Sequence, residues 1–303
     1  MNFLQTYLSS GLSNLSTQTV FENSHSKLSI LRDDRLSFGM GTKFRKFWGI
    51  HSDLEKKKIK KVVLQGELHS NALTAFAFLF YNFGYKVRTL CYTRDKIRIS
   101  ANSIFVKKNS HFLEKWDSRS NWKNAVEQIQ IDKESEVLIP EYGLILSASN
   151  SLHTIWKQIR VEEWDSLIID LGSGLTWLSA KCFYQNQIPI YGISIGLSKK
   201  KMIPWLEEKR NSLGLENFPI KESFVLESGF RQGFGSLNSN ILEYCNSFYL
   251  KSGIPIEPIY SGRSLFAIEK KMEQGELIGK ILYLHQGGLW NFLDALLAKK
   301  DRL

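Results

Sequence analysis

The stretch "DSLIIDLGSGLTWLSAKCFYQ" (residues 165–185) joins a strand, a glycine-bearing turn and a helix. An apolar run interrupted only by Asp170 is typical of a buried strand, and the apolar segment after the turn is typical of a buried helix. Backbone N–H groups of such a turn point toward the helix N-terminus, where phosphate groups bind. The turn consists of Gly172, Ser173, Gly174, Leu175 and Thr176. The alternative is a tight turn that needs only flexible residues.

The same alternation extends over the rest of the chain. Strands are expected at 60–67, 85–93, 135–143, 188–196 and 280–288, and helices at 70–84, 150–164 and 239–253. Strands that alternate with helices are the mark of an α/β architecture with a largely parallel sheet. The predicted fold class is therefore α/β.

Three of the strands end in small, polar turns: "QGELHSNA" (65–72), "DLGSGLTW" (170–177) and "LHQGGLWN" (284–291). Ligands of α/β sheets bind beyond the carboxyl ends of the strands, so we expect these turns to meet in one cleft. The middle turn lacks the Lys-Ser/Thr of a P-loop and the third glycine of a dinucleotide site. Pyridoxal phosphate is a phosphate ligand whose aldehyde also bonds a lysine, and "LSFGMGTKFRKFWGI" (36–50) offers Lys43. The alternative is a surface lysine.

Composition limits the remaining possibilities. The chain has 303 residues, 43% of them apolar, and a formal charge of +10, so one or two globular domains are expected. The basic clusters "EKKKIKK" (55–61) and "SKKKM" (198–202) do not interleave with aromatic residues and accompany no nucleic-acid motif. They are interpreted as solvated helix faces, and neither a nucleic-acid nor a membrane partner is predicted.

The cysteines and the apolar segments indicate a cytoplasmic protein. Cys91, Cys182 and Cys245 have no CxxC spacing, so neither a disulfide framework nor a metal site is predicted. The N-terminus lacks the pattern of a signal peptide. The apolar run at 72–85 is too short to span a bilayer.

Four segments together resemble one family. "LRDDRLSFGMGTKFRKF" (31–47) is similar to the "RDD…GNKxRKL" motif of the 1-aminocyclopropane-1-carboxylate deaminase and D-cysteine desulfhydrase family, pyridoxal-phosphate enzymes of the tryptophan synthase β-like fold type II. "LQGELHSNALTAFAFLFYNFG" (64–84) resembles its "GGxxSNH" segment and "LGSGLT" (171–176) its phosphate turn. "GIPIEPIYSGRSLFAI" (253–268) with "KILYLHQGGLW" (280–290) resembles its C-terminal motifs.

The resemblance implies roles for individual residues. Lys43 would bond the cofactor covalently, Ser70 would move a proton at the substrate α-carbon, and Asn71 would hydrogen-bond the phenolic oxygen of the cofactor. The alternative for Ser70 and Asn71, a helix N-cap, is compatible with these roles. Tyr260 would stack near the cofactor ring, and ordinary core packing is its alternative. The cofactor site would comprise Lys43, Asn71, Gly172, Ser173, Gly174, Leu175, Thr176, Ser261 and Gln286.

Several positions depart from the family pattern. Phe234 replaces a tyrosine, and a phenyl ring cannot relay a proton. Ser261 stands where the deaminases have a glutamate at the pyridine nitrogen, and Gln286 where the desulfhydrases have a threonine; either residue can hydrogen-bond the nitrogen, but neither carries a negative charge. Glu67 replaces a glycine, and His69 precedes the Ser-Asn pair.

The predicted function is a pyridoxal-phosphate-dependent lyase or deaminase of a small amino acid. D-Cysteine desulfhydrase-like α,β-elimination, giving pyruvate, ammonia and sulfide, is ranked first because a neutral partner of the ring nitrogen suits elimination. Ring-opening deamination of 1-aminocyclopropane-1-carboxylate is the second activity. A catalytically degenerate homologue is a hypothesis of a different class, and a basic module that binds nucleic acid is the third hypothesis. The resemblance also implies a homodimer and two three-layer α/β/α domains with mostly parallel sheets. They would consist of residues 1–50 with 150–303, which bind the cofactor, and an inserted domain at 51–149.

Overall fold

The computed structural model describes residues 3–216, 218–230 and 239–290. Their chain contacts divide into two compact units. Unit 1 comprises the described residues 3–10 and 43–151, and unit 2 comprises residues 11–42 and 152–290. The division into residues 1–50 with 150–303 and residues 51–149 stays a prediction.

Unit 1 is built on a four-stranded parallel sheet with the strand order β5-β4-β3-β6. The strands are β3 (Lys61–Glu67), β4 (Lys86–Tyr92), β5 (Phe112–Trp116) and β6 (Glu136–Leu138). The helices are α1 (Phe3–Ser9), α2 (Thr42–Lys56), α3 (Asn71–Asn82), α4 (Ala101–Lys108), α5 (Arg119–Glu127) and α6 (Leu146–Ser151), with a 3-10 turn η2 (Glu141–Gly143). The expected βαβ unit of β3, α3 and β4 is confirmed.

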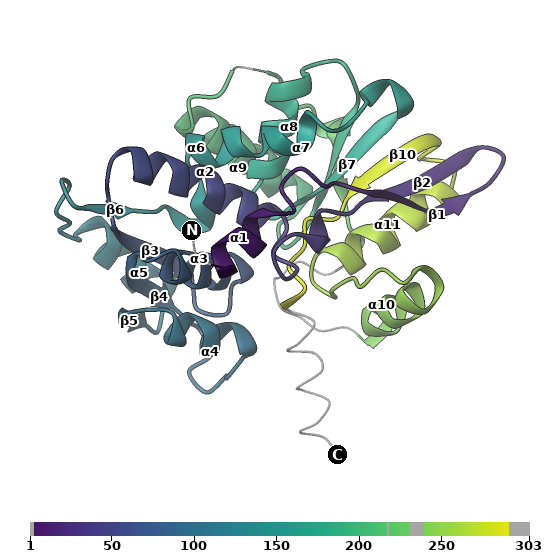
Figure 1. Ribbon diagram of the computed structural model, residues 1–303. Coiled ribbons are helices and arrows are strands. Elements are labelled where there is room, and N and C mark those ends of the chain that lie inside the picture. Colours follow the sequence, from purple (N-terminus) through teal and green to yellow (C-terminus); the bar gives the residue numbers. More distant parts are fainter. Residues whose placement is uncertain (1–2, 217, 231–238, 291–303) are drawn as a thin grey trace. The chain divides into compact units, whose positions relative to one another are not determined.

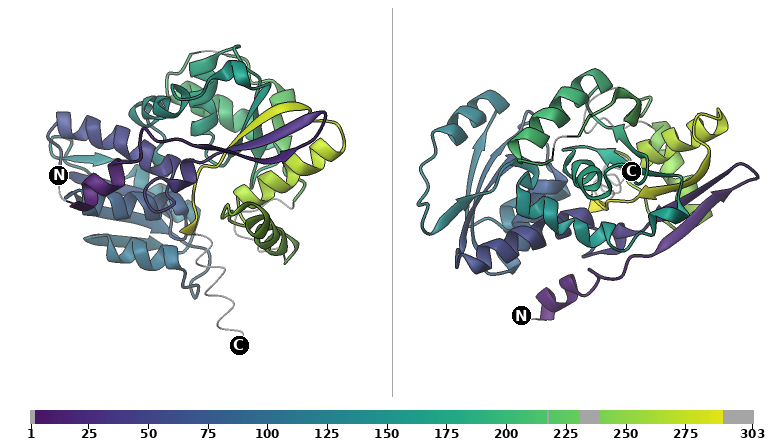
Figure 2. Two further views of the ribbon diagram at one scale, coloured as in Figure 1. Left: turned by 45° about the vertical axis from the view of Figure 1, so that its right-hand side comes forward. Right: turned by 90° about the horizontal axis from the view of Figure 1, so that it is seen from above.

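Unit 2 is built on a six-stranded sheet with the order β1-β2-β10-β7-β8-β9. Only β1 (Thr17–Glu22) and β2 (Ser26–Leu31) pair antiparallel; β7 (Ser166–Leu171), β8 (Ile190–Ser194), β9 (Val225–Glu227) and β10 (Gly279–Leu284) complete a mostly parallel sheet. The helices are α7 (His153–Trp156), α8 (Leu175–Tyr184), α9 (Lys199–Ser212), α10 (Ser239–Ser252) and α11 (Ser261–Glu273). The 3-10 turns are η1 (Asp33–Arg35), η3 (Val161–Glu163) and η4 (Glu222–Phe224). Figures 1 and 2 show β1 and β2 at one edge of this sheet, next to β10.

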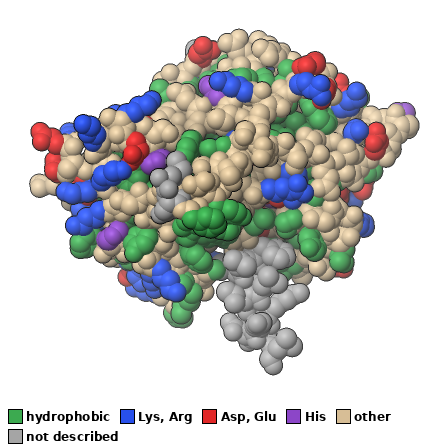
Figure 3. Space-filling model, in the orientation of Figure 1, with side chains coloured by type: hydrophobic (Ala, Val, Ile, Leu, Met, Phe, Trp, Pro, Cys, Tyr) green, Lys and Arg blue, Asp and Glu red, His purple; other side chains and the backbone are tan. Residues whose placement is uncertain are grey.

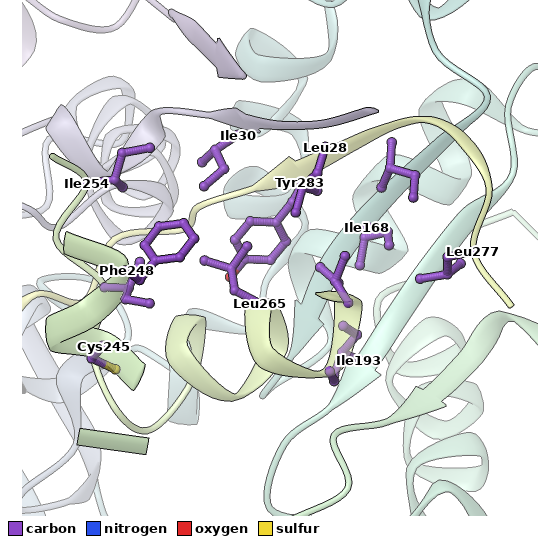
Figure 4. Packing of buried hydrophobic residues seen from close by; sticks show 14 of the residues in the cluster. Leu28, Ile30, Ile168, Ile193, Cys245, Phe248, Ile254, Leu265, Leu277 and Tyr283 are labelled. Atoms are coloured by element: carbon purple, nitrogen blue, oxygen red, sulfur yellow. The ribbon is translucent and has the colours of Figure 1, made fainter. Parts of the chain in front are cut away.

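The core of unit 2 lies between the sheet and helices α10 and α11 (Figure 4). Ile168 of β7 and Ile193 of β8 pack there with Leu265 of α11 and Phe248 of α10. All six residues of β7 are buried, because helices cover both faces of a parallel sheet. The α/β fold class with two mostly parallel sheets is thereby confirmed.

The expected helix at 150–164 is wrong. The chain forms α6 and the one-turn helix α7 instead, and Val161 lies in the 3-10 turn η3. The carbonyl of Trp156 accepts a hydrogen bond from the hydroxyl of Tyr184 at 2.7 Å, and the indole of Trp156 donates to Ser179 at 3.0 Å. These contacts with α8 hold the chain where α7 ends, and local periodicity could not reveal them.

The described surface agrees with what the composition predicts about membrane spans and charge. Within the described ranges, no helix is long and apolar enough to cross a membrane. On the face shown in Figure 3, lysine and arginine side chains are separated by acidic and uncharged ones.

Candidate active site

The phosphate turn and the diglycine turn lie side by side in unit 2. Strands β7 and β10 are parallel neighbours, with Leu284 opposite Ile169, so both turns leave the same edge of the sheet. The side-chain amide of Gln286 donates to the backbone oxygen of Asp170 at 3.0 Å and ties the turns together. Two of the three turns that the sequence singles out are thus brought together; the third lies in unit 1, and a common cleft stays a prediction.

The phosphate turn ends at the N-terminus of α8. Gly174 is the N-cap, has φ +87°, and gives no side-chain cap. A Cβ atom at this position would lie 2.4 Å from Cδ2 of Leu206, so only glycine fits. The N–H groups of Leu175 and Thr176 have no acceptor in the described part of the chain, as the first amides of a helix lack an intrahelical partner. Trp205 donates to the backbone oxygen of Ser173 at 3.1 Å. This is a donor set suited to a phosphate group.

Tyr260 and Ser261 lie beside this turn. A Cβ atom at Gly172 would be 3.1 Å from Cε1 of Tyr260, so the tyrosine ring lies against the glycine. Ser261 begins α11 and is 1% exposed. Its Oγ accepts the backbone N–H of Glu257 at 2.9 Å, and its hydroxyl donates to the backbone oxygen of the same residue at 3.4 Å.

Glu257 holds this region, and sequence reasoning missed it. Its carboxyl group accepts the backbone N–H groups of Ile259 at 2.9 Å, Tyr260 at 2.6 Å and Ser261 at 2.9 Å. The side chain is 0% exposed. An acidic residue just before a helix is a recognised capping signal, but the prolines on both sides of Glu257 suggested an extended approach.

Replacing Glu257 by alanine is expected to lower the free energy of unfolding by about 3 kcal/mol, because one buried and two partly buried N–H groups lose their acceptor. Glu257→Gln keeps one oxygen and should lose less. Urea denaturation of the three proteins measures the effect. Equal losses for both variants would contradict the assignment of the N–H groups to two carboxyl oxygens.

The loop before Lys43 is fixed to the diglycine turn of unit 2. The backbone N–H and the hydroxyl of Thr42 both point to the carbonyl oxygen of Gln286, at 3.2 and 3.3 Å. The N–H of Gly288 donates to the oxygen of Gly39 at 2.7 Å. Lys43 is the next residue after Thr42 and the second residue of α2, and it is half-buried.

The basic neighbours of Lys43 are not surface residues. Arg45 and Lys46 are both buried. Burial and, to a smaller extent, the positive charge of Lys43 one turn earlier together lower the pKa of Lys46 to about 7. The chain therefore holds a second amine of reduced basicity close to Lys43, which a test of Lys43 has to separate from it.

Ser70 and Asn71 begin α3 in unit 1. Ser70 is the N-cap, and its Oγ accepts the N–H of Leu73 at 3.2 Å, which confirms the capping interpretation. Asn71 is buried, and its Oδ1 accepts from the side-chain amide of Asn102 at 3.1 Å. Because Oδ1 is the acceptor in this bond, the Nδ2 group is the part of the Asn71 side chain that can donate. Asn102 lies in a segment for which no site residue is predicted from the sequence.

Each unit thus holds a separate set of predicted residues. Unit 2 brings together Gly172, Ser173, Gly174, Leu175, Thr176, Tyr260, Ser261 and Gln286. Lys43, Ser70 and Asn71 belong to unit 1. Phe234 lies outside the described residues. The catalytic and binding roles of all these residues stay predictions.

Known proteins resemble the chain over most of its length. No family model matches it. A protein of Pyrococcus furiosus named "Putative 1-aminocyclopropane-1-carboxylate deaminase" is 22% identical over 284 residues, which cover 86% of this chain and 84% of that protein. A solved structure described as an ACC deaminase homologue covers 90% of this chain and 89% of its own, with a TM-score of 0.73 and 21% identity.

The chain is a distant homologue of the 1-aminocyclopropane-1-carboxylate deaminase family. A hydrogen sulfide-producing enzyme of Fusobacterium nucleatum shares its fold with a TM-score of 0.62 and 13% identity, covering 95% of this chain and 98% of that one. The fold of this chain matches that of fold type II pyridoxal-phosphate enzymes, among them a pyridoxal 5'-phosphate-dependent aspartate racemase with a TM-score of 0.60 and 11% identity that covers 94% of each chain.

The residues of unit 2 fit pyridoxal phosphate in two respects. The uncapped amides of α8 suit a phosphate group, and Gly172 and Gly174 pack so closely against Tyr260 and Leu206 that the turn has no room for side chains there. The side-chain amide of Gln286 has a second N–H besides the one bonded to Asp170 and is a neutral donor for a ring nitrogen, whereas the hydroxyl of Ser261 would have to give up its 3.4 Å bond to the oxygen of Glu257.

Proposed function

We propose that the chain is a pyridoxal-phosphate-dependent enzyme that releases ammonia from a small amino acid, with Lys43 and Ser70 as catalytic residues. The observation that carries the proposal is the hydrogen-bonded edge of unit 2. Thr42, the residue before Lys43, is bonded to Gln286 in the diglycine turn after β10. Gln286 is bonded in turn to Asp170, next to the phosphate turn after the neighbouring strand β7. The homology of the whole chain supports the same cofactor.

The roles of the residues follow from their donors and acceptors. When bound, pyridoxal phosphate supplies an aldehyde that bonds amines and a ring that stabilises negative charge on a substrate α-carbon. The amides of the phosphate turn would hold the phosphate, and Tyr260, whose ring lies against Gly172, would contact the cofactor ring. Nδ2 of Asn71 would donate to the phenolic oxygen.

The hydroxyl of Ser70 receives and returns the proton of the α-carbon. Its Oγ already accepts the N–H of Leu73 as the α3 cap, so the hydroxyl is oriented before substrate binds. Lys43 would be the amine that holds the aldehyde of the cofactor.

Two activities of this class are compatible with these roles. The name of the relatives favours ring-opening deamination of 1-aminocyclopropane-1-carboxylate over the elimination that the sequence ranked first. The neutral side chain of Ser261 at the expected position of a glutamate favours α,β-elimination from a D-cysteine-like substrate.

The test is an assay of both substrates with the cofactor-loaded protein. We expect ammonia from at least one of them, and none above background from Lys43→Ala. Ammonia from the cyclopropane substrate without sulfide from D-cysteine selects deamination, and the reverse selects elimination. If the wild type binds the cofactor but turns over neither substrate, the chain is a catalytically degenerate homologue and the proposal is wrong.

A further inference from the structure

His69 is held by its neighbours at every polar atom except one. Its backbone N–H donates to Oε2 of Glu67 at 2.9 Å, and its backbone oxygen accepts from the amide of Asn102 at 2.8 Å. Its Nδ1 lies 2.6 Å from Oγ of Ser100. The residue is 8% exposed, and its Nε2 is buried with no hydrogen-bond partner in the described chain. All four residues belong to unit 1.

The hydrogen bonds of Ser100 favour the tautomer of His69 that carries its proton on Nε2, because a Ser100 hydroxyl that accepted from Nδ1–H would leave its own proton without an acceptor in the described chain. Oγ of Ser100 caps α4 by accepting the N–H of Ser103 at 3.0 Å. The only acceptor that the described structure provides for the hydroxyl proton is Nδ1 of His69. Nδ1 is then an acceptor, and a neutral ring carries its proton on Nε2.

The ring is neutral near pH 7. Burial lowers the pKa of His69 to about 4, and the positive charges of Arg98, Lys107 and Lys115 add to this effect against the opposing charge of Asp95. His69 therefore offers one N–H donor and no positive charge. A buried donor without an acceptor costs free energy, and such groups in native structures call for an explanation.

The position of His69 indicates what the donor is for. It directly precedes Ser70 and Asn71, and Asn102 bonds both the backbone oxygen of His69 and Oδ1 of Asn71. The imidazole, the predicted proton-transfer group and the predicted cofactor ligand are thus held by one network at the end of β3. A side chain positioned this firmly beside reacting groups is typical of a specificity determinant.

We propose that the Nε2–H of His69 hydrogen-bonds an acceptor on the substrate side chain, so that the enzyme prefers small amino acids with a polar β-substituent. This rests on the proposed function, because it places the substrate next to Ser70. A hydrocarbon ring such as that of 1-aminocyclopropane-1-carboxylate leaves the donor unpaired. The proposal therefore predicts a ranking opposite to the one that the relatives' name favours.

Serine and alanine form a matched pair of probes, because they differ by one hydroxyl group. Each enantiomer is titrated into the cofactor-loaded protein, and binding is followed by absorption. Wild type is expected to bind serine about tenfold more tightly than alanine, in line with one net hydrogen bond in a buried site. His69→Phe should bring this ratio close to one, and His69→Gln, which keeps an N–H donor, should restore part of it.

An unchanged serine-to-alanine ratio in His69→Phe would overturn the proposal if the variant still binds the cofactor. If His69→Phe does not fold, the serine-to-alanine ratio of Ser100→Ala decides. This change removes the hydrogen bond that orients the imidazole ring and should lower the preference for serine. Binding of the cofactor by the wild type and Lys43-dependent ammonia release report on the proposed function separately, so its failure is recognised by itself.

The proton position has its own measurement, which needs no cofactor. The chain has six histidines, and nitrogen-15 imidazole spectra of the protein should show one signal pair, absent from His69→Gln, with a protonated Nε2 and an unprotonated Nδ1 between pH 6 and 8. A proton on Nδ1 would remove the donor and contradict the proposal, whatever the substrate assays show.

Discussion

Replacing Lys43 by alanine is expected to abolish covalent uptake of pyridoxal phosphate and to lower ammonia release by on the order of 10³-fold or more. The reason is that the cofactor aldehyde bonds an amine, and the backbone before Lys43 is fixed by two hydrogen bonds from Thr42 to Gln286. Borohydride reduction of the loaded protein, followed by peptide mapping, measures where the cofactor is attached. The wild type should carry it on Lys43.

Two other lysines of α2 provide the controls. Lys56 is exposed at the end of the helix, and Lys56→Ala should leave attachment and turnover unchanged. Lys46 is buried, and its pKa is lowered to about 7, so it is the amine most able to compete for the aldehyde. Attachment of the cofactor to Lys46 in the wild type would contradict our proposal that Lys43 is the reactive lysine.

Replacing Gly41 by alanine is expected to lower the free energy of unfolding by about 3 kcal/mol and to weaken cofactor binding. Gly41 has φ +56°, a region that residues with a Cβ atom rarely adopt. The added Cβ would also lie 2.4 Å from the carbonyl oxygen of Gln286 and 3.0 Å from that of Asp33. The backbone would have to move at the point where Thr42 is bonded to Gln286. Urea denaturation and cofactor titration measure the two effects.

Gly253 is a matched control for the conformational part of this cost. It has φ +68°, but no atom lies within 4 Å of a Cβ atom added there. Gly253→Ala should therefore cost only about 1–2 kcal/mol and leave cofactor binding unchanged. If the two variants lose the same stability and both bind the cofactor normally, the close contact of Gly41 with the diglycine turn is not what fixes this loop.

Much of the fold could be predicted because its signals are local. The apolar run at 166–171 and the glycines after it give β7 and the start of α8, and the Ser70 cap gives the start of α3. The broken helices after residue 146 could not be predicted in the same way. The end of α7 depends on the bond that the indole of Trp156 donates to Ser179 and on the bond that its carbonyl accepts from Tyr184. Both partners are more than twenty residues away in the sequence.

The candidate site shows the same difference between what the sequence predicts and what the tertiary structure determines. The sequence by itself determined which residue types were present: a lysine behind a glycine turn, a phosphate turn at a helix N-terminus, and a Ser-Asn pair that caps a helix. Only the tertiary structure decided what orients residues 69 and 71, because Asn102 and Ser100 bond them from the start of α4, more than thirty residues away in the sequence. Glu257 acts locally instead, on backbone N–H groups two to four residues further along the chain. Buried polar groups need hydrogen-bond partners, and which residues become those partners depends on the folded backbone and not on the local sequence.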